Sequence, residues 1–260
     1  MKNAGPPLVV AIGGFDPSCG AGVVADARSI EAMGALPVAV ATAITVQSGT
    51  GVRRFTALPA ARVLDQLDEL LANLPVAAFK LGQVPTAAIA RGLAARLAAT
   101  GLPVVLDPVL VASGGGPLVG PGALEAIRAK LLPLVSLLTV NLAESAVLCD
   151  GPIRGLEGMR RAARRLQDRG VEAVLVKGGH LRGEPVDVLR YHGGEVLLRG
   201  RRLSGSMHGT GCALASAIAA RLACGDALEE AVRAGRKHVR SLISGSIVVG
   251  RARLRAPALS

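Results

Sequence analysis

The chain has 260 residues and half of them are hydrophobic, so it is long enough to bury one large core. A single domain over residues 1–260 is therefore expected. The net charge of +11 favours anionic partners such as nucleotide phosphates, but only 2% of the residues are aromatic, which argues against nucleic-acid binders that stack bases on aromatic rings.

Two further classes are disfavoured by the sequence. No apolar run of about 18 residues goes uninterrupted by Gly, Pro or charge, so we expect no membrane span. The four cysteines show no metal-binding spacing, and residues 1–7 do not resemble an export signal. These observations predict reduced thiols in a cytoplasmic protein.

The first predicted unit is a strand, a glycine-rich loop, a helix and a second strand. The strand is 8–12, the loop 13–22, the helix about 21–33 with Gly34 as its C-cap, and the next strand 38–46. This order is a βαβ unit. The loop lacks the G-x-G-x-x-G spacing and no acidic residue ends the second strand, so NAD binding is rejected.

Helices and strands alternate through most of the remaining chain, after a polar loop that begins at Gln47. The predicted helices are 60–73, 86–100, 121–132, 156–169 and 227–244. The predicted strands are 77–82, 102–106, 136–140, 171–176 and a hairpin formed by 187–190 and 195–198. This pattern predicts an α/β fold, with a mostly parallel central sheet and helices on both faces.

Polar residues and glycines stand where these strands end. Ligands of such sheets bind beyond the carboxyl ends of the strands, at the point where the strand order reverses. We therefore expect one site to include Gly14, Gln47, Lys80, Asp107, Asn141 and Lys177.

A second glycine loop opens a helix near the carboxyl end of the chain. The helix is expected to begin at about Cys212, directly after Gly209-Thr-Gly211. Free N–H groups and the helix dipole then point at one spot and form an anion hole. A thiolate would be stabilised there, which predicts a lowered pKa for Cys212. The alternative is an ordinary helix start in which Cys212 is a small apolar filler.

The motifs together resemble the hydroxymethylpyrimidine/phosphomethylpyrimidine kinases of thiamine biosynthesis, which belong to the ribokinase-like superfamily. The segments that carry the resemblance are Gly13–Asp26, Lys80–Gly82, Leu106–Val109, Asn141–Glu144, Val176–His180 and His208–Cys212. It covers about residues 8–245 and implies a ribokinase-like fold. It also implies ATP- and Mg²⁺-dependent phosphorylation of 4-amino-5-hydroxymethyl-2-methylpyrimidine and of its monophosphate, by an enzyme that is commonly a homodimer.

The resemblance also implies roles for individual residues. The residues implied for the pyrimidine pocket are Gly14, Gln47 and Val109 at or after strand ends, and Asp26 in the predicted helix. Those implied for ATP are Asn141, Lys177, Thr210 and Gly211, and those for Mg²⁺ are Asn141, Glu144 and Asp107. The loop from Gly209 to Gly211 would stabilise charge during transfer, together with Lys177, and Cys212 would stand at the position of the catalytic base.

Ordinary structural roles remain open for the same residues. Asp107 is alternatively a helix or loop cap, Glu144 a first-turn helix acid, and Lys177 a solvated lysine at a strand end. Asp26 is alternatively a solvated or capping residue.

Three departures from the family pattern leave two other functions open. Ser113 and Gly116 replace polar residues of a loop that covers phosphate, Gln83 replaces a Met, and the residues after Gly245 lack the Gly/His-rich signature of the family. The alternatives are a pyridoxal (vitamin B6-type) kinase on the same fold and a pyrimidine-binding regulatory protein with weak or lost kinase activity.

Overall fold

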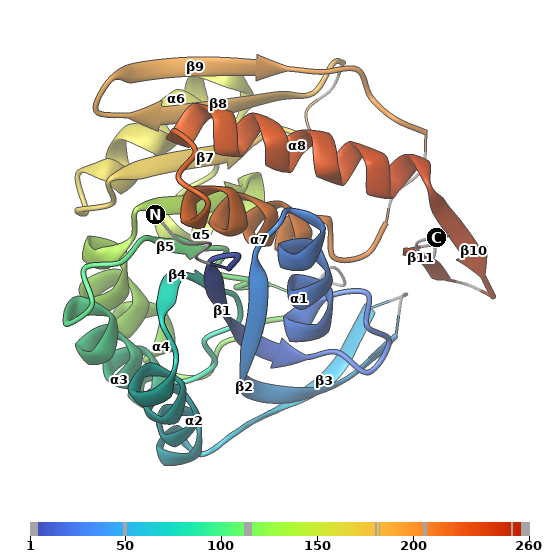
Figure 1. Cartoon of the computed structure of the whole chain (residues 1–260). Coiled ribbons are helices and arrows are strands. Elements are labelled where there is room, and N and C mark those ends of the chain that lie inside the picture. Colours follow the sequence, from blue (N-terminus) through green and yellow to red (C-terminus); the bar gives the residue numbers. More distant parts are fainter. Residues whose placement is uncertain are drawn as a thin grey trace.

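A sheet of nine strands crosses the part of the chain that the structure describes, in the order β3-β2-β1-β4-β5-β6-β7-β8-β9 (Figure 1). The structure is a computed structural model that describes residues 5–48, 51–111, 116–179, 181, 183–204, 207–250 and 252–255. The strands are β1 (Leu8–Phe15), β2 (Leu36–Ser48), β3 (Gly51–Ala57), β4 (Val76–Leu81), β5 (Val104–Leu106), β6 (Leu137–Asn141), β7 (Ala173–Lys177), β8 (Val186–Tyr191) and β9 (Gly194–Arg199).

The consecutive strands β2-β1-β4-β5-β6-β7 of the sheet are parallel to one another. β3, β8 and β9 run antiparallel to their neighbours. The mostly parallel sheet that the alternating pattern predicts is therefore confirmed. β8 and β9 form the predicted hairpin.

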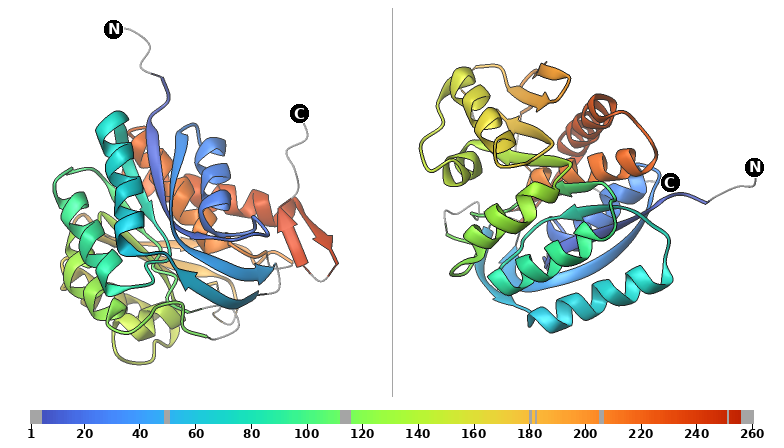
Figure 2. Two further views of the ribbon diagram at one scale, coloured as in Figure 1. Left: turned by 90° about the horizontal axis from the view of Figure 1, so that it is seen from below. Right: turned by 90° about the vertical axis from the view of Figure 1, so that its left-hand side faces the viewer.

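Helices cover both faces of the sheet, as predicted. They are α1 (Gly22–Ala32), α2 (Ala60–Asn73), α3 (Ala87–Ala98), α4 (Ala123–Ala126), α5 (Leu142–Leu148), α6 (Gly155–Gln167), α7 (Thr210–Ala223) and α8 (Leu228–Ser244). Figure 2 shows α1 and α2 on opposite sides of the strands. Within the described residues, no helix is long and apolar enough to cross a membrane.

Each face of the sheet has its own hydrophobic core. Val10 and Ile12 of β1 pack toward α2, α3 and α6, whereas Val9 and Ala11 pack toward α1, α7 and α8. A strand buried on both faces needs apolar residues at every position, which is why residues 8–12 show no alternation. β1 lies between β2 and β4, so the strand order reverses beside it.

Some elements differ from the predicted ones. Residues 51–57 were expected in a loop but form the edge strand β3, whose exposed Arg53, Arg54 and Thr56 hide the strand pattern. The predicted helix 121–132 is a short α4 followed by a π-helical turn and a 3₁₀ turn that contains Pro133, which lacks a backbone N–H. α5 was not predicted.

A small antiparallel hairpin also follows α8. Its strands are β10 (Ser246–Val249) and β11 (Ala252–Arg255), and it projects from the end of α8 (Figure 1). The sequence analysis did not predict it.

Candidate active site

Four neighbouring parallel strands, β4 to β7, bring their carboxyl ends together beneath the amino end of α7. Lys80 lies in β4, Asp107 directly follows β5, and Asn141 and Lys177 end β6 and β7. α7 packs against β1, β4 and β5, so its first turn faces these strand ends. It begins at Thr210, two residues before the predicted start.

The first of two buried ion pairs joins β4 to α1. Lys80 Nζ lies 2.7 Å from Asp26 Oδ2, and the Ser216 hydroxyl of α7 donates to Asp26 Oδ1 at 2.8 Å. Both charged side chains are almost fully buried, with exposures of 1% for Lys80 and 0% for Asp26. Burial favours the neutral amine, but Asp26 and the nearby Cys212 and Asp107 outweigh it and raise the pKa of Lys80. Lys80 is therefore a permanent cation under the amino end of α7.

Asp26 supports the site from beneath. Both of its carboxylate oxygens accept hydrogen bonds from the protein, and it has no exposed surface. A direct contact with a pyrimidine, which the resemblance implies, would require one of these two bonds to open. The solvated role considered for Asp26 is wrong.

The second ion pair lies one strand further along the sheet. Lys177 Nζ donates to Asp107 Oδ1 at 2.8 Å, and the Thr139 hydroxyl donates to the same oxygen at 3.1 Å. Burial opposes ionisation of Asp107, but Lys177 and Lys80 hold the pKa of its carboxyl below the ordinary value. A Cβ at Gly211 would lie 3.2 Å from Asp107 Oδ2 and 3.3 Å from Lys177 Nζ, so the first turn of α7 rests directly on this pair.

The two glycine loops touch each other through their backbones. Gly209, the N-cap of α7, has φ +83°, and a Cβ on it would lie 1.9 Å from the Gly20 carbonyl oxygen. A side chain at this position would therefore be strained and would also separate the loops. The first turn of α7 and the loop after β1 thus form one structure.

Asp16 fixes the conformation of the loop after β1. Its carboxylate accepts from the backbone N–H and the hydroxyl of Ser18, both at 2.8 Å, and from the Ala21 N–H at 2.9 Å. His208 Nε2 lies 3.4 Å from Asp16 Oδ2. Burial acts in the opposite direction, but the contacts with His208, Ser18 and Ala21 lower the pKa of Asp16 to about 2.

The pKa of the Cys212 thiol differs from the predicted one. Burial raises the pKa of its thiol to about 12, although the Lys80 charge and a hydrogen bond from the Gly22 backbone act in the opposite direction. The predicted lowering is therefore wrong for this state of the protein. The helix dipole does favour a thiolate here, but removing the sulfur from water disfavours it more strongly, and the carboxylates of Asp26 and Asp107 add to that effect.

This raised pKa predicts slow alkylation of Cys212 in the protein without ligands. At pH 8 only a small fraction of the thiol is ionised, and since the thiolate is the nucleophile, the rate should keep rising with pH above 9. Site-resolved mass spectrometry after iodoacetamide treatment measures this, with the exposed Cys224 as the internal comparison. A rate that levels off below pH 8 would show a lowered pKa and restore the original prediction.

Asn141 and Glu144 form a reciprocal capping box at the start of α5. The Glu144 N–H donates to Asn141 Oδ1, and the Asn141 N–H donates to Glu144 Oε2, both at 2.9 Å. Glu144 is thus a first-turn acid of α5, the ordinary structural role left open for it, and its role as a Mg²⁺ ligand stays a prediction. Burial raises the pKa of its carboxyl, an effect that Lys177 opposes and Asp107 strengthens.

These residues suit a cation that keeps much of its water shell. The described residues contain no cluster of three His, Cys, Asp or Glu side chains able to hold a metal. The capping box uses one oxygen of Glu144, which leaves a buried carboxylate oxygen for Mg²⁺, an ion that typically binds proteins through one or two carboxylates. The third expected ligand, Asp107, is paired with Lys177 through Oδ1.

A cavity of about 470 Å³ opens beside the amino end of α7. All four residues implied for ATP line it: Asn141, Lys177, Thr210 and Gly211. Four arginines line it as well, namely Arg201, Arg202, Arg236 and Arg240, together with apolar side chains of α7 and α8. Its size and its excess of positive charge suit a nucleotide with several phosphates.

Three of the four residues implied for the pyrimidine lie at or after the ends of β1, β2 and β5, whereas Asp26 lies in α1. Gly14 is covered by Gln83, whose Oε1 would lie 2.5 Å from a Cβ at position 14, and Gln83 Nε2 donates to the Leu118 carbonyl at 3.0 Å. Gln47 is half-buried near the end of β2, and Val109 has a positive φ of +37°. Ser113 and His180 lie outside the described residues, and Gly116 is exposed.

Comparison with known proteins identifies the family to which the chain belongs. The family model described as "Phosphomethylpyrimidine kinase" matches residues 16–256. The chain belongs to the phosphomethylpyrimidine kinase family. It is 38% identical to the hydroxymethylpyrimidine/phosphomethylpyrimidine kinase of Streptomyces coelicolor, over 94% of this chain and 91% of that one. The corresponding kinase of Rhizobium meliloti is 39% identical, over 92% and 91% of the two chains.

Solved structures agree with membership of the phosphomethylpyrimidine kinase family and with the ribokinase-like fold. The phosphomethylpyrimidine kinase of Clostridium difficile superposes with a TM-score of 0.80 at 30% identity, over 90% of this chain and 98% of that chain. The pyridoxal kinase of Staphylococcus aureus in complex with AMP-PCP superposes with a TM-score of 0.88 at 28% identity, over 97% and 93%. The chain is a kinase of this fold.

The sequence analysis did not identify some residues of this phosphomethylpyrimidine kinase site. Thr139 is a polar residue within an apolar strand, which was a usable signal for its bond to Asp107. Ser216 lies among helix formers and Arg236 among solvated arginines, so neither stood out. Asp187 was assigned only to a hairpin strand, although it lines the cavity.

Proposed function

We propose that the chain phosphorylates 4-amino-5-hydroxymethyl-2-methylpyrimidine and its monophosphate with ATP and Mg²⁺, as a single kinase domain. The observation that carries this proposal is the amino end of α7. It rests on the Lys177–Asp107 pair, adjoins a basic cavity of about 470 Å³ on one side, and contacts the loop after β1 on the other. A phosphate donor and an acceptor alcohol would therefore meet at the same backbone N–H groups.

Transfer in this site depends mainly on charge. The N–H groups of residues 209–211 and the Lys177 ammonium stabilise the negative charge that spreads over the transferred phosphoryl oxygens. Asn141 and Glu144 would hold Mg²⁺, which neutralises phosphate charge when it is bound. Cys212, with a pKa raised to about 12, is protonated at neutral pH, so we assign it to contact with the acceptor hydroxyl. We do not assign it the role of a strong base.

A second candidate substrate is pyridoxal. The pyridoxal kinases of Staphylococcus aureus and Bacillus subtilis both superpose with a TM-score of 0.88, above the 0.80 of the Clostridium difficile phosphomethylpyrimidine kinase. The sequence relatives favour the pyrimidine, since those at 38% and 39% identity carry that name.

A panel of substrates tests the proposal. ADP release with Mg-ATP should be rapid with hydroxymethylpyrimidine and its monophosphate, slow with pyridoxal, and reduced in Cys212→Ala. Turnover of pyridoxal alone would transfer the assignment to the second candidate. Binding of hydroxymethylpyrimidine without turnover of any of the three would favour the regulatory alternative.

We further propose a homodimer in the cytoplasm. Three apolar side chains at the ends of β1 and β2 support the dimer: Phe15, Ile44 and Val46 are 39%, 52% and 44% exposed, and Phe15 and Ile44 are paired in register. Exposed apolar groups that share one face of a sheet favour association with another surface. Four free cysteines, one of them exposed, suit a reducing compartment.

A further inference from the structure

Asp187 is the only carboxylate among the described residues that line the nucleotide cavity. The same cavity is lined by Lys177 and by four arginines. A carboxylate facing a site for polyphosphate repels the ligand unless a nearby cation neutralises it. A carboxylate at position 187 therefore needs a physical explanation.

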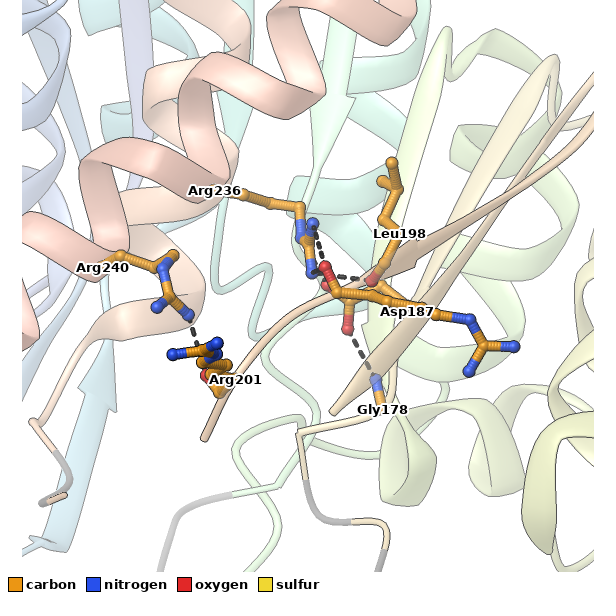
Figure 3. A network of polar contacts seen from close by, with 7 residues as sticks. Gly178, Asp187, Leu198, Arg201, Arg236 and Arg240 are labelled. Carbon is orange, nitrogen blue, oxygen red and sulfur yellow. Dashed lines mark hydrogen bonds and ion pairs between the residues drawn. The ribbon is translucent and has the colours of Figure 1, made fainter. Parts of the chain in front are cut away.

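Both carboxylate oxygens of Asp187 are engaged by the protein (Figure 3). Oδ1 accepts from the Gly178 N–H at 2.8 Å, and Oδ2 accepts from Arg236 Nε at 2.9 Å. Arg236 also donates to the Leu198 carbonyl at 2.7 Å. The pair thus joins the loop after β7, the start of β8, the end of β9 and the middle of α8.

The bond to Gly178 acts directly on the residue beside it, Lys177. A Cβ at Gly178 would lie 1.9 Å from the Val186 carbonyl oxygen, so this peptide is pressed against β8 and only glycine fits. Asp187 fixes the orientation of the Gly178 N–H and, with it, the backbone at which the Lys177 side chain begins. At the other end of that side chain, the Lys177 ammonium is held by Asp107.

A second arginine holds the rest of the same loop. The Arg202 guanidinium donates to the carbonyl oxygens of Gly179, Leu181 and Gly183, at 2.8, 2.6 and 3.1 Å. The loop after β7 is therefore attached at its first residue through Asp187 and further along through Arg202. The Asp187 attachment lies next to the phosphate-binding lysine.

We propose that Asp187 and Arg236 form a positioning pair for the nucleotide. Together they set the backbone after Lys177, so that its ammonium is already placed when the phosphates arrive, and Arg236 removes the repulsion that Asp187 would otherwise exert. A lysine that is already fixed in place loses little conformational entropy on binding, whereas a mobile lysine would lose more. The proposal rests on the nucleotide role of the cavity described above.

Four variants test it: Asp187→Ala, Asp187→Asn, Arg236→Lys and, as matched control, Arg233→Met. Arg233 is on the same helix in an exposed ion pair with Glu229, away from the cavity. The measurements are the KM for ATP and for the pyrimidine, and the dissociation constant of ADP by calorimetry. Asp187→Ala should raise both nucleotide constants by about 10- to 100-fold and leave the KM for the pyrimidine within about twofold.

The conservative variants separate positioning from general stability. Asp187→Asn keeps an acceptor for the Gly178 N–H and should recover much of the ATP affinity. Arg236→Lys keeps the charge but loses the fork that contacts Asp187 and Leu198 at the same time, and should raise the KM for ATP severalfold even if Asp187→Ala does not fold. Arg233→Met should match the wild type.

Two results would overturn the positioning role. One is nucleotide constants close to wild type in both Asp187→Ala and Arg236→Lys. The other is a parallel rise of the KM for the pyrimidine, which would show a general structural effect. A wild-type protein that neither binds ADP nor turns over ATP would instead remove the proposed function, and this inference with it.

Discussion

Replacing Lys177 with methionine should lower kcat by about 100- to 1000-fold, the range seen when one preorganised group that stabilises transition-state charge is removed. Lys177 lines the cavity proposed for the nucleotide, and its Nζ would lie 3.3 Å from a Cβ at Gly211 in the first turn of α7. It also neutralises Asp107, whose Oδ1 it contacts at 2.8 Å. The variant would therefore lose a cation and gain an uncompensated buried carboxylate next to the phosphates.

A double variant distinguishes these two effects. Lys177→Met with Asp107→Asn removes the uncompensated charge, so it should recover stability and some ATP affinity but little turnover. Lys130→Met, at an exposed lysine of the turn after α4, provides the control for loss of one positive charge. Single-turnover rates and thermal unfolding measure the two properties separately. Full turnover in the Lys177→Met enzyme would show that the loop of residues 209–211 needs no lysine.

The order of elements could be predicted because each strand and helix carries its own local signal. α2 spans Ala60–Asn73, the predicted bounds, and Gly34, one residue after Met33 as the C-cap of α1, has the positive φ of +88° common at that position. β3 was lost because an edge strand exposes polar residues on both sides of its backbone and resembles a loop. Elements buried in the core are thus easier to predict than those at an edge.

The gathering of the site at the strand ends could be predicted, but its internal pairing could not. The sequence analysis placed Lys80 at a strand end and Asp26 in a helix, 54 residues apart. Their contact depends on β4 lying beside β1 and on the side from which α1 covers the sheet. No local pattern encodes either fact.

The prediction for Cys212 failed for a related reason. The glycine loop and helix start that favour a thiolate are visible in the sequence, whereas burial of the sulfur is a property of the assembled fold. Two opposing effects act on one group, and only the weaker of them can be read from the sequence. The same limitation applies to Asp187, whose role depends on a neighbour, Arg236, 49 residues away.

Breaking the Lys80–Asp26 pair should have the largest effect on stability. Lys80→Met is expected to lower the free energy of unfolding by about 3–5 kcal/mol, because it leaves a buried carboxylate without its counter-ion. Ser216 would then be the remaining side-chain donor to Asp26 in the described structure. Urea denaturation monitored by circular dichroism measures the change.

The pH dependence of this loss follows from the charge on Lys80. Its pKa is raised above the ordinary value of 10.5, so the stability that the pair contributes is complete below pH 10.5 and declines only as the pH rises through the higher folded-state value. Between pH 6 and 9 the wild-type lysine should therefore stay charged. In Lys80→Met the Asp26 carboxyl keeps the burial that raises its pKa and loses the lysine charge that lowers it, so the disadvantage of the variant should grow as the pH rises. A disadvantage that shrank toward pH 9 would mean that the amine loses its proton in the folded wild type.

Removal of both partners should be milder than removal of either one. Lys80→Met with Asp26→Asn leaves no buried charge. The loss of unfolding free energy in this double variant should therefore be well below the sum of the losses in the two single variants. If the double variant is stable but inactive, the pair serves the reaction by placing positive charge under α7. If it is stable and active, the pair serves the fold alone, and the charge that assists transfer comes from Lys177 and the loop of residues 209–211.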